Sequence, residues 1–310
     1  MPHEPPPPSP AQPLANLLVV AIEQAVAAPM CTLRLADAGA RVIKIERQEG
    51  ETARQYDRAV HGVSAYFAWL NRGKESCALD LKAKDDLALV RRMIKKADIF
   101  VQNFAPGAVA RLGLSYEAMA AINPKLIMVS IVGYGQNTDY AEARAYDLLV
   151  QAESGLCAVN GTPQTACRVG GSVADIATGM NAHAAVLQAL IERGQTGRGC
   201  HLELALFDTL ADWMNVPLLH LEQAGNETPR IGLAHAAIHP YGAYACRDGE
   251  VVIVVQNPAE WLRLCDKVLM RPDLVKDPRF IDNPARLANR PALQTIIADV
   301  FIKLTRQEAM

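Results

Sequence analysis

Residues 168–208 read RVGGSVADIATGMNAHAAVLQALIERGQTGRGCHLELALFD, and their pattern predicts a long helix followed by a strand. The glycine pair Gly170–Gly171 comes before a stretch in which apolar residues recur at helical spacing, namely Ile176, Met180, Ala184, Val186, Leu187 and Leu190. We expect the helix to end at Gly194, and the glycine-rich turn after it to lead into a strand over 200–208.

Asp175 is a lone carboxylate that we expect to stand just before this helix. One interpretation is an N-cap, because an aspartate there accepts backbone N–H bonds and favours the positive helix end. The other interpretation is a nucleophile. A carboxylate at a helix N-terminus stays ionised at neutral pH, and neighbouring glycines let a substrate come close. The pattern alone leaves both open.

Short apolar runs alternate with helical patterns through the first half of the chain, with strands expected at 17–22, 42–46, 99–104 and 126–132 and helices at 29–38, 85–96 and 116–122. This alternation predicts an α/β fold with a Rossmann-like, doubly wound parallel sheet. Ligands bind at the carboxyl ends of such strands, where Arg47, Asn103, Phe104 and Tyr134 fall. The sequence has neither G-x-G-x-x-G nor G-x-x-x-x-G-K-[ST], so the usual NAD and ATP loops are excluded.

The pattern predicts four regions along the chain. Residues 1–14 form a proline-rich, disordered tail, and residues 15–206 form the large Rossmann-like domain. A linker helix over 207–225 joins it to a smaller α+β domain over 226–310, which contains a hairpin with its turn at Arg247-Asp248-Gly249. The last helix begins near residue 292 and is still running at Met310.

Composition narrows the classes of function. The 310 residues carry a net charge of −2, which gives no reason to expect binding to nucleic acid or to an anionic membrane. The seven cysteines are scattered without C-x-x-C spacing, and the histidines lack metal-ligand spacing, so we expect no disulfide framework and no metal site. Reduced thiols and an acidic, proline-rich start without a signal peptide indicate a cytoplasmic protein.

Five stretches of the sequence resemble the family III CoA-transferases, which include formyl-CoA and carnitine CoA-transferases and the related alpha-methylacyl-CoA racemase. They are 23–47 (EQAVAAPMCTLRLADAGARVIKIER), 71–82 (NRGKESCALDLK), 103–114 (NFAPGAVARLGL), 143–156 (ARAYDLLVQAESGL) and 168–208. The resemblance implies that Asp175 is the covalent nucleophile. Backbone N–H groups near Gly170 and Gly171 would hold the oxyanion.

The resemblance also implies a groove for coenzyme A, bound as a substrate and not as a permanent cofactor. Its positions match Arg47, Lys82, Asn103, Phe104, Arg111 and Arg144. Plainer interpretations remain open for several of them. Arg47 and Lys82 could be surface charges, Arg111 could pair with Glu117, and Asn103 could cap a turn.

Tyr146 and Asp147 match the family segment beside the active site. Asp147 could orient Asp175 or could cap a helix over 148–154. The racemase relatives have a histidine where this chain has Tyr146, and a tyrosine is a poor acid–base group near neutral pH, which favours transfer over racemisation. His235 and His239 resemble a segment that faces the acid substrate in some members, although both could be structural.

These points predict an enzyme that moves CoA from an acyl-CoA to a free carboxylic acid through an aspartyl-CoA thioester. The segment IHPYGAY resembles members that use small dicarboxylates such as succinate, citramalate, mesaconate or itaconate. Three alternatives remain: a racemase-like isomerase, a serine hydrolase that uses Ser172 in a relaxed G-x-S-x-G elbow, and a non-catalytic CoA-binding protein.

Family members form an interlocked homodimer, in which a C-terminal segment returns to the first domain. The resemblance implies that this return segment is absent here, so we expect a truncated small domain and a weakened dimer.

Overall fold

The computed structural model describes residues 12–310, so most of the predicted proline-rich tail lies outside the described residues. Two compact units are present. The first contains the described residues up to Leu156 together with Arg168–Val216, and the second contains Cys157–Cys167 and Pro217–Met310. These boundaries differ from the predicted ones at 206 and 226, because the first unit continues to Val216. In addition, a short segment before the glycine pair belongs to the second unit.

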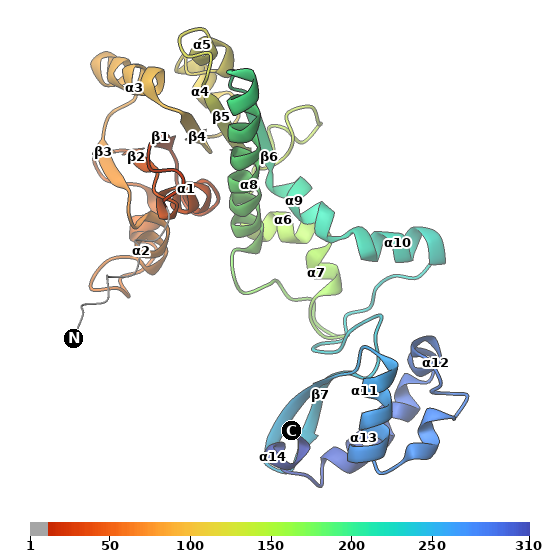
Figure 1. Ribbon diagram of the computed structural model, residues 1–310. Helices are drawn as coiled ribbons and strands as arrows, with labels where there is room; N and C mark the ends of the chain where they lie inside the picture. The colour runs from red at the N-terminus through yellow and green to blue at the C-terminus, as the bar shows by residue number, and fades with distance from the viewer. Residues whose placement is uncertain (1–11) are drawn as a thin grey trace, which may run out of the picture. The chain divides into compact units, whose positions relative to one another are not determined.

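A six-stranded parallel sheet forms the centre of the first unit, in the order β3-β2-β1-β4-β5-β6 (Figure 1). Its strands are β1 (Leu18–Ile22), β2 (Arg41–Glu46), β3 (Glu75–Ala78), β4 (Ile99–Gln102), β5 (Ile127–Val132) and β6 (His201–Ala205). The predicted Rossmann-like sheet is confirmed. Successive strands are added toward one edge from β1 to β3 and toward the other edge from β4 to β6. The strand order therefore reverses between β1 and β4, which is where such folds bind ligands.

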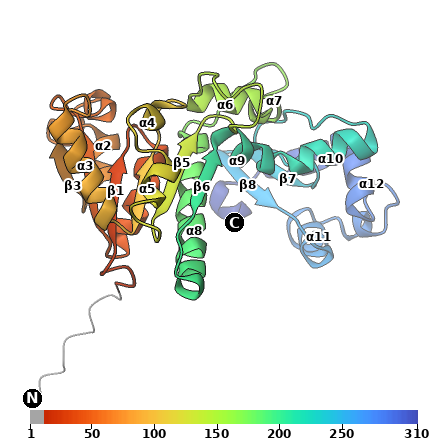
Figure 2. The same ribbon diagram turned by 90° about the horizontal axis from the view of Figure 1, so that it is seen from above.

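Helices cover both faces of this sheet because each central strand is apolar on both sides. On one face the core contains residues of α1 (Ala27–Asp37), α6 (Asp147–Glu153), α8 (Val173–Thr196) and α9 (Leu206–Trp213). On the other it contains residues of α3 (Lys84–Lys96), α4 (Ala108–Arg111) and α5 (Tyr116–Ala120). Both ribbon views show α8 alongside β5 and β6 (Figures 1 and 2). The smaller elements η1 (Thr52–Gln55), α2 (Ala65–Asn71) and α7 (Leu156–Val159) complete this part of the chain.

Helix α8 is longer than the sequence indicated. It passes through Gly194 and ends at Thr196, where Gly197 takes a left-handed conformation with φ of 71°. The prediction of a stop at Gly194 was wrong, since a helix tolerates an interior glycine at a modest cost, whereas the left-handed residue after its end needs one.

The predicted linker helix over 207–225 is two helices, α9 and α10 (Asn215–Ala224). Leu206 and Leu210 of α9 are buried in the core of the first unit, so α9 belongs to that unit. The prediction of one linker helix over 207–225 was therefore wrong.

The second unit is built on the predicted hairpin, β7 (Tyr241–Cys246) paired antiparallel with β8 (Gly249–Val254). Its helical elements are α11 (Pro258–Arg263), the π turn η2 (Leu264–Val268), η3 (Pro272–Val275), α12 (Asn283–Ala288), α13 (Arg290–Phe301) and α14 (Arg306–Ala309). The expectation of one helix running to Met310 was wrong: α13 ends at Phe301, and a capping box between Thr305 and Glu308 starts α14.

Among residues 12–310, no helix combines the length and apolar composition that crossing a bilayer requires.

A close contact between α1 and α8 places the start of α8 against the sheet. Gly179 is buried, and a Cβ atom there would lie 2.4 Å from the Ala27 carbonyl oxygen and 2.6 Å from Met30 Cβ. The two backbones therefore meet at a distance that only glycine allows.

We predict that Gly179→Ala lowers the free energy of unfolding by about 1–3 kcal/mol, because the added methyl group forces α1 and α8 apart. Gly194→Ala is the matched control in the same helix. Its Cβ would meet nothing within 4 Å, so it should stabilise by roughly 0.5–1 kcal/mol. Denaturant unfolding of both variants measures the difference, and a Gly179→Ala protein as stable as the wild type would contradict this packing.

Candidate active site

Asp175 lies inside the first turn of α8, two residues after the helix begins at Val173. Ser172 holds the N-cap position, and its side chain makes no capping hydrogen bond. The interpretation of Asp175 as the N-cap was therefore wrong. No hydrogen bond from residues 12–310 reaches its half-buried carboxylate, so this charge is left without the support that a cap would have.

Burial, and then the nearby charge of Asp147, raise the pKa of Asp175 to about 7. The prediction that the helix end keeps this carboxylate fully ionised at neutral pH was wrong, since loss of solvent and a like charge outweigh the favourable helix terminus. At neutral pH the group is close to half ionised. Such a carboxylate is available as a nucleophile while being poorly stabilised by its surroundings.

Asp147, the first residue of α6, is the buried carboxylate that faces the start of α8. Its Oδ1 accepts the backbone N–H of Ala174 at 2.8 Å, and its Oδ2 accepts the side-chain amide of Gln151 at 2.7 Å. It therefore caps the first turn of α8 instead of its own helix. By holding the residue directly before Asp175, Asp147 fixes the direction in which the Asp175 side chain leaves the backbone.

The glycine pair borders open space. Gly170 and Gly171 are exposed, and a Cβ atom on either would meet nothing within 4 Å, so a substrate can approach this backbone. The Arg168 guanidinium donates to the Gly170 carbonyl oxygen.

Ser172 does not stand in a hydrolase elbow. No strand precedes it, and its Oγ lies 3.2 Å from the Tyr66 hydroxyl, with no histidine bonded to it among the described residues. The serine-hydrolase alternative therefore lacks both its turn and its base.

Asn103 joins the ends of β1 and β4 at the point where the sheet order reverses. Its Oδ1 accepts the Gln24 backbone N–H at 3.0 Å, and its Nδ2 donates to the Gln24 carbonyl oxygen at 2.9 Å. Phe104 packs partly buried on the neighbouring core, and its N–H donates to Gln102. Asn103 thus clamps two strand ends instead of capping a turn.

The four cations expected at a CoA groove, Arg47, Lys82, Arg111 and Arg144, are all exposed and all belong to the first unit. None of their side chains forms an ion pair within residues 12–310, which leaves their charges free for phosphate groups. The alternative in which Arg111 pairs with Glu117 was wrong: the Arg111 guanidinium lies against Gly107, 2.9 Å from where a Cβ would stand.

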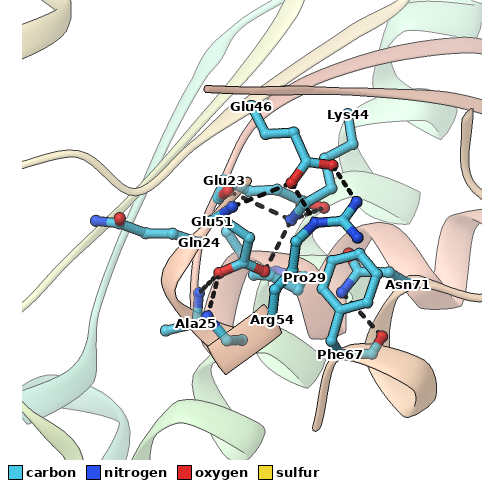
Figure 3. A network of polar contacts seen from close by, with 12 residues as sticks. Glu23, Gln24, Ala25, Pro29, Lys44, Glu46, Glu51, Arg54, Phe67 and Asn71 are labelled. Carbon is cyan, nitrogen blue, oxygen red and sulfur yellow. Dashed lines mark hydrogen bonds and ion pairs between the residues drawn. The ribbon is translucent and has the colours of Figure 1, made fainter. Parts of the chain in front are cut away.

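A network of six charged side chains lies at the carboxyl ends of β1 and β2, and sequence reasoning missed it (Figure 3). Lys74 Nζ lies 2.7 Å from Glu23 Oε1, Lys44 Nζ lies 3.2 Å from Glu51 Oε1, and Arg54 Nη2 lies 2.6 Å from Glu46 Oε1. Three cations thus balance three anions. The signal was present in the sequence, because Lys44 stands in the middle of an apolar strand that is buried on both faces.

This network also fixes the turn that starts α1. Glu51 Oε2 accepts the backbone N–H groups of Ala25 and Ala53, both at 2.9 Å, and Ala25 has a φ of 60°, which is rare for a residue with a side chain. Burial would raise the pKa of Glu23, but Lys74 and Lys44 outweigh it and hold that pKa below its ordinary value. The paired charges keep the strand ends rigid next to the site.

Three tyrosines belong to the segments around the charge network and the start of α8. Burial, followed by the charges of Glu51 and Asp175, raises the pKa of Tyr56, so this ring lies near both groups. Tyr56 and Tyr66 meet edge to face with ring centroids 5.9 Å apart. Tyr146, at the N-cap of α6, is 69% exposed, which leaves its phenol accessible to a bound molecule.

The two histidines of the second unit differ from each other. His235 is exposed, and its Nδ1 accepts the Ala237 N–H at 3.0 Å. His239 is only 1% exposed, and neither ring nitrogen has a partner among residues 12–310. Burial, with Arg290 and Arg286 nearby, lowers its pKa to about 4, so the ring is neutral at neutral pH. Its burial favours the structural interpretation that the sequence left open over a position facing the acid substrate.

Within residues 12–310, no three histidine, cysteine or acidic side chains gather in a way that could hold a metal ion.

Comparison with known proteins identifies the family of this chain. Residues 14–310 match the family described as CoA-transferase family III. The chain belongs to CoA-transferase family III. It is thus an acyl-CoA:carboxylate CoA-transferase, and CoA thioesters are its substrates.

Its similarity to individual members extends over nearly the whole chain. An acetyl-CoA:oxalate CoA-transferase of Acetobacter aceti is 38% identical over 300 residues, which cover 96% of this chain and 77% of that protein. A succinate–glutarate CoA-transferase of Agrobacterium fabrum is 34% identical over 307 residues, with 96% and 76% coverage. A CAIB/BAIF family protein from Brucella suis has a crystal structure similar to this transferase, with a TM-score of 0.82, 35% identity, and coverage of 96% of this chain and 80% of that one.

We predict that the Asp175 carboxyl group of the transferase titrates near pH 7 and that Asp147→Asn moves this titration to lower pH, because it removes a like charge. The ¹³C chemical shift of labelled aspartate carboxyl groups measures it.

Glu192→Gln is the control for this titration. It removes a charge from the same helix 17 residues further on, about 25 Å away at ~1.5 Å per residue, and should leave the Asp175 titration unchanged. If Asp175 titrates at the same pH in the wild type and in Asp147→Asn, the two carboxylates are not coupled.

Proposed function

We propose that this transferase moves CoA from an acyl-CoA to a small dicarboxylic acid, with Asp175 as the covalent nucleophile. The observation that carries the proposal is a half-buried carboxylate without a hydrogen-bond partner in residues 12–310, at a helix start, beside an open glycine pair. A structural aspartate at a helix start would accept backbone N–H bonds, and that task belongs to Asp147 here.

The reaction proceeds in two balanced halves. The Asp175 carboxylate attacks the thioester carbonyl, the C–S bond breaks, and CoA leaves as a thiolate while an acyl-aspartyl anhydride forms. The thiolate then attacks the aspartyl carbonyl, the bond between this carbonyl carbon and the bridging oxygen breaks, and the first acid leaves with that oxygen as its carboxylate. Asp175 now carries CoA as a thioester. The second acid reverses both steps and takes the CoA, so one thioester is exchanged for another.

The surroundings of Asp175 favour these intermediates. Its charge is poorly solvated and lies near the charge of Asp147, so the free carboxylate is raised in energy. Both the anhydride and the thioester are uncharged at Asp175, and forming either relieves this repulsion. The backbone N–H groups of Gly170 and Gly171 are the donors that we assign to the oxyanion that forms in between.

A dicarboxylate acceptor is supported by the relatives named for oxalate, succinate and glutarate. A second carboxylate on the substrate needs a cation or an N–H donor near the reacting group. Exposed Arg144, two residues before the Tyr146 N-cap of α6, is suited to bind this second carboxylate. Exposed Arg47 and Arg111 are suited to bind the phosphate groups of CoA. Racemisation is less suitable, because Tyr146 offers a phenol where an acid–base histidine would be required.

We predict that Asp175→Ala and Asp175→Asn lower kcat for CoA transfer by about 10³-fold or more, since no other residue supplies the attacking oxygen. Glu192→Gln should keep wild-type turnover. Assays with oxalate, succinate, glutarate and, as a monoacid, acetate measure both the loss and the acid preference, and circular dichroism checks the fold. Near-normal transfer by a folded Asp175→Ala protein would refute the covalent role.

A further inference from the structure

We propose that Gln151 is a positioning residue for the transfer reaction, because its side chain ties the segment before Asp175 to the carboxylate of Asp147. This inference rests on the proposed role of Asp175. Neither the resemblance to the family nor the sequence pattern had pointed to Gln151.

The Gln151 side chain is fully buried in α6, one helical turn after Asp147. Its Nε2 donates to Asp147 Oδ2 at 2.7 Å, and its Oε1 accepts the backbone N–H of Val169 at 2.8 Å. Both ends of the amide are thus engaged with strong geometry. Val169 directly precedes the glycine pair, so Gln151 holds the N-terminal end of the segment 170–173 that leads to Asp175.

The other end of the same segment is held by Asp147. Its second oxygen accepts the N–H of Ala174, directly before Asp175. Residues 170–173 therefore run between two anchors that both come from α6. Gly170 and Gly171 have no side chains and stand in open space, so this stretch is held by backbone and side-chain hydrogen bonds and not by packing. Besides the two anchors, Arg168 donates to the Gly170 carbonyl oxygen, and the Ser172 hydroxyl lies 3.2 Å from that of Tyr66. The two anchors, joined to each other through the Gln151–Asp147 bond, give this stretch one shape.

Only an amide satisfies both neighbours of this position. The Val169 N–H needs an acceptor, and the Asp147 carboxylate needs a donor. A glutamate would keep the acceptor but would place a second carboxylate against Asp147. A methionine of similar length would provide neither bond. Gln151→Glu thus tests the effect of an added carboxylate beside Asp147, and Gln151→Met tests the loss of both hydrogen bonds.

Besides Asp147, three tyrosines belong to the segments around the start of α8. Tyr56 follows η1, Tyr66 comes from α2, and Tyr146 precedes α6. All three side chains are phenols and not carboxylates. Asp147 is therefore the charge that responds to a change at residue 151, and the pH dependence of the reaction reports on it.

The test compares Gln151→Glu, Gln151→Met and the control Gln188→Glu, which makes the same chemical change at an exposed position of α8. Initial rates across pH 5.5–9 give kcat and KM for the acyl-CoA, where this range is chosen to span roughly two units around Asp175. The ¹³C titration of Asp175 gives a second readout that does not need turnover.

We expect Gln151→Glu to move the acid limb of kcat/KM and the Asp175 titration to higher pH, because it adds negative charge beside Asp147. Gln151→Met should lower kcat by about 10- to 100-fold, the loss of one or two buried hydrogen bonds, with KM changed by less than about threefold. Gln188→Glu should match the wild type in all three measurements.

An acid limb that stays in place in Gln151→Glu, or a folded Gln151→Met protein with wild-type kcat, would overturn the inference. If one variant does not fold, the other decides. A wild-type protein that transfers no CoA would instead refute the proposed function, and the Asp175 titration in Gln151→Glu would still show whether Gln151 acts on this site.

Discussion

Two carboxylates share one poorly solvated corner of this fold, and the rest of the first unit is arranged around that constraint. Asp147 accepts two hydrogen bonds, from the backbone N–H of Ala174 and from the side-chain amide of Gln151. Asp175 receives none from the described residues, and its pKa rises to about 7. The unequal distribution of donors gives the two groups different tasks, one structural and one chemical.

Holding these groups close together requires rigid backbone around them. Gly179 lets α8 pack directly on the first turns of α1, and Asn103 clamps the strand ends where the sheet order reverses. The six-charge network next to that point is balanced, and all of its side chains except Arg54 are almost fully buried, so removing one buried partner would leave an uncompensated charge. Such a network stabilises little by itself, but it fixes the Ala25 turn in a conformation that the chain would not adopt alone.

The sequence predicted the parts of the fold that depend on local pattern. The central strands are continuous apolar runs, and α3 has acidic residues at its start and lysines at its end. The edge strand β3 was missed because it is short and largely exposed. The break after α13 was signalled by Thr305 and Glu308, a capping box that an apolar-periodicity argument overlooked.

At the site, position and type of residue were predictable, but environment was not. Asp175 was found from its glycine neighbours and the family resemblance, whereas its pKa depends on burial and on a residue 28 positions earlier. Gln151 was missed because its partner Val169 is 18 residues away and only the fold brings them together. Likewise, the sequence cannot show that His239 is buried and not exposed.

The central claim is that Asp175 carries CoA covalently during transfer. The most direct measurement is mass spectrometry of the protein after incubation with an acyl-CoA alone. The account predicts that the peptide containing Asp175 gains the mass of CoA less one water, and that adding a dicarboxylic acid removes it. Turnover without an adduct on Asp175, or with an adduct on another residue, would contradict it.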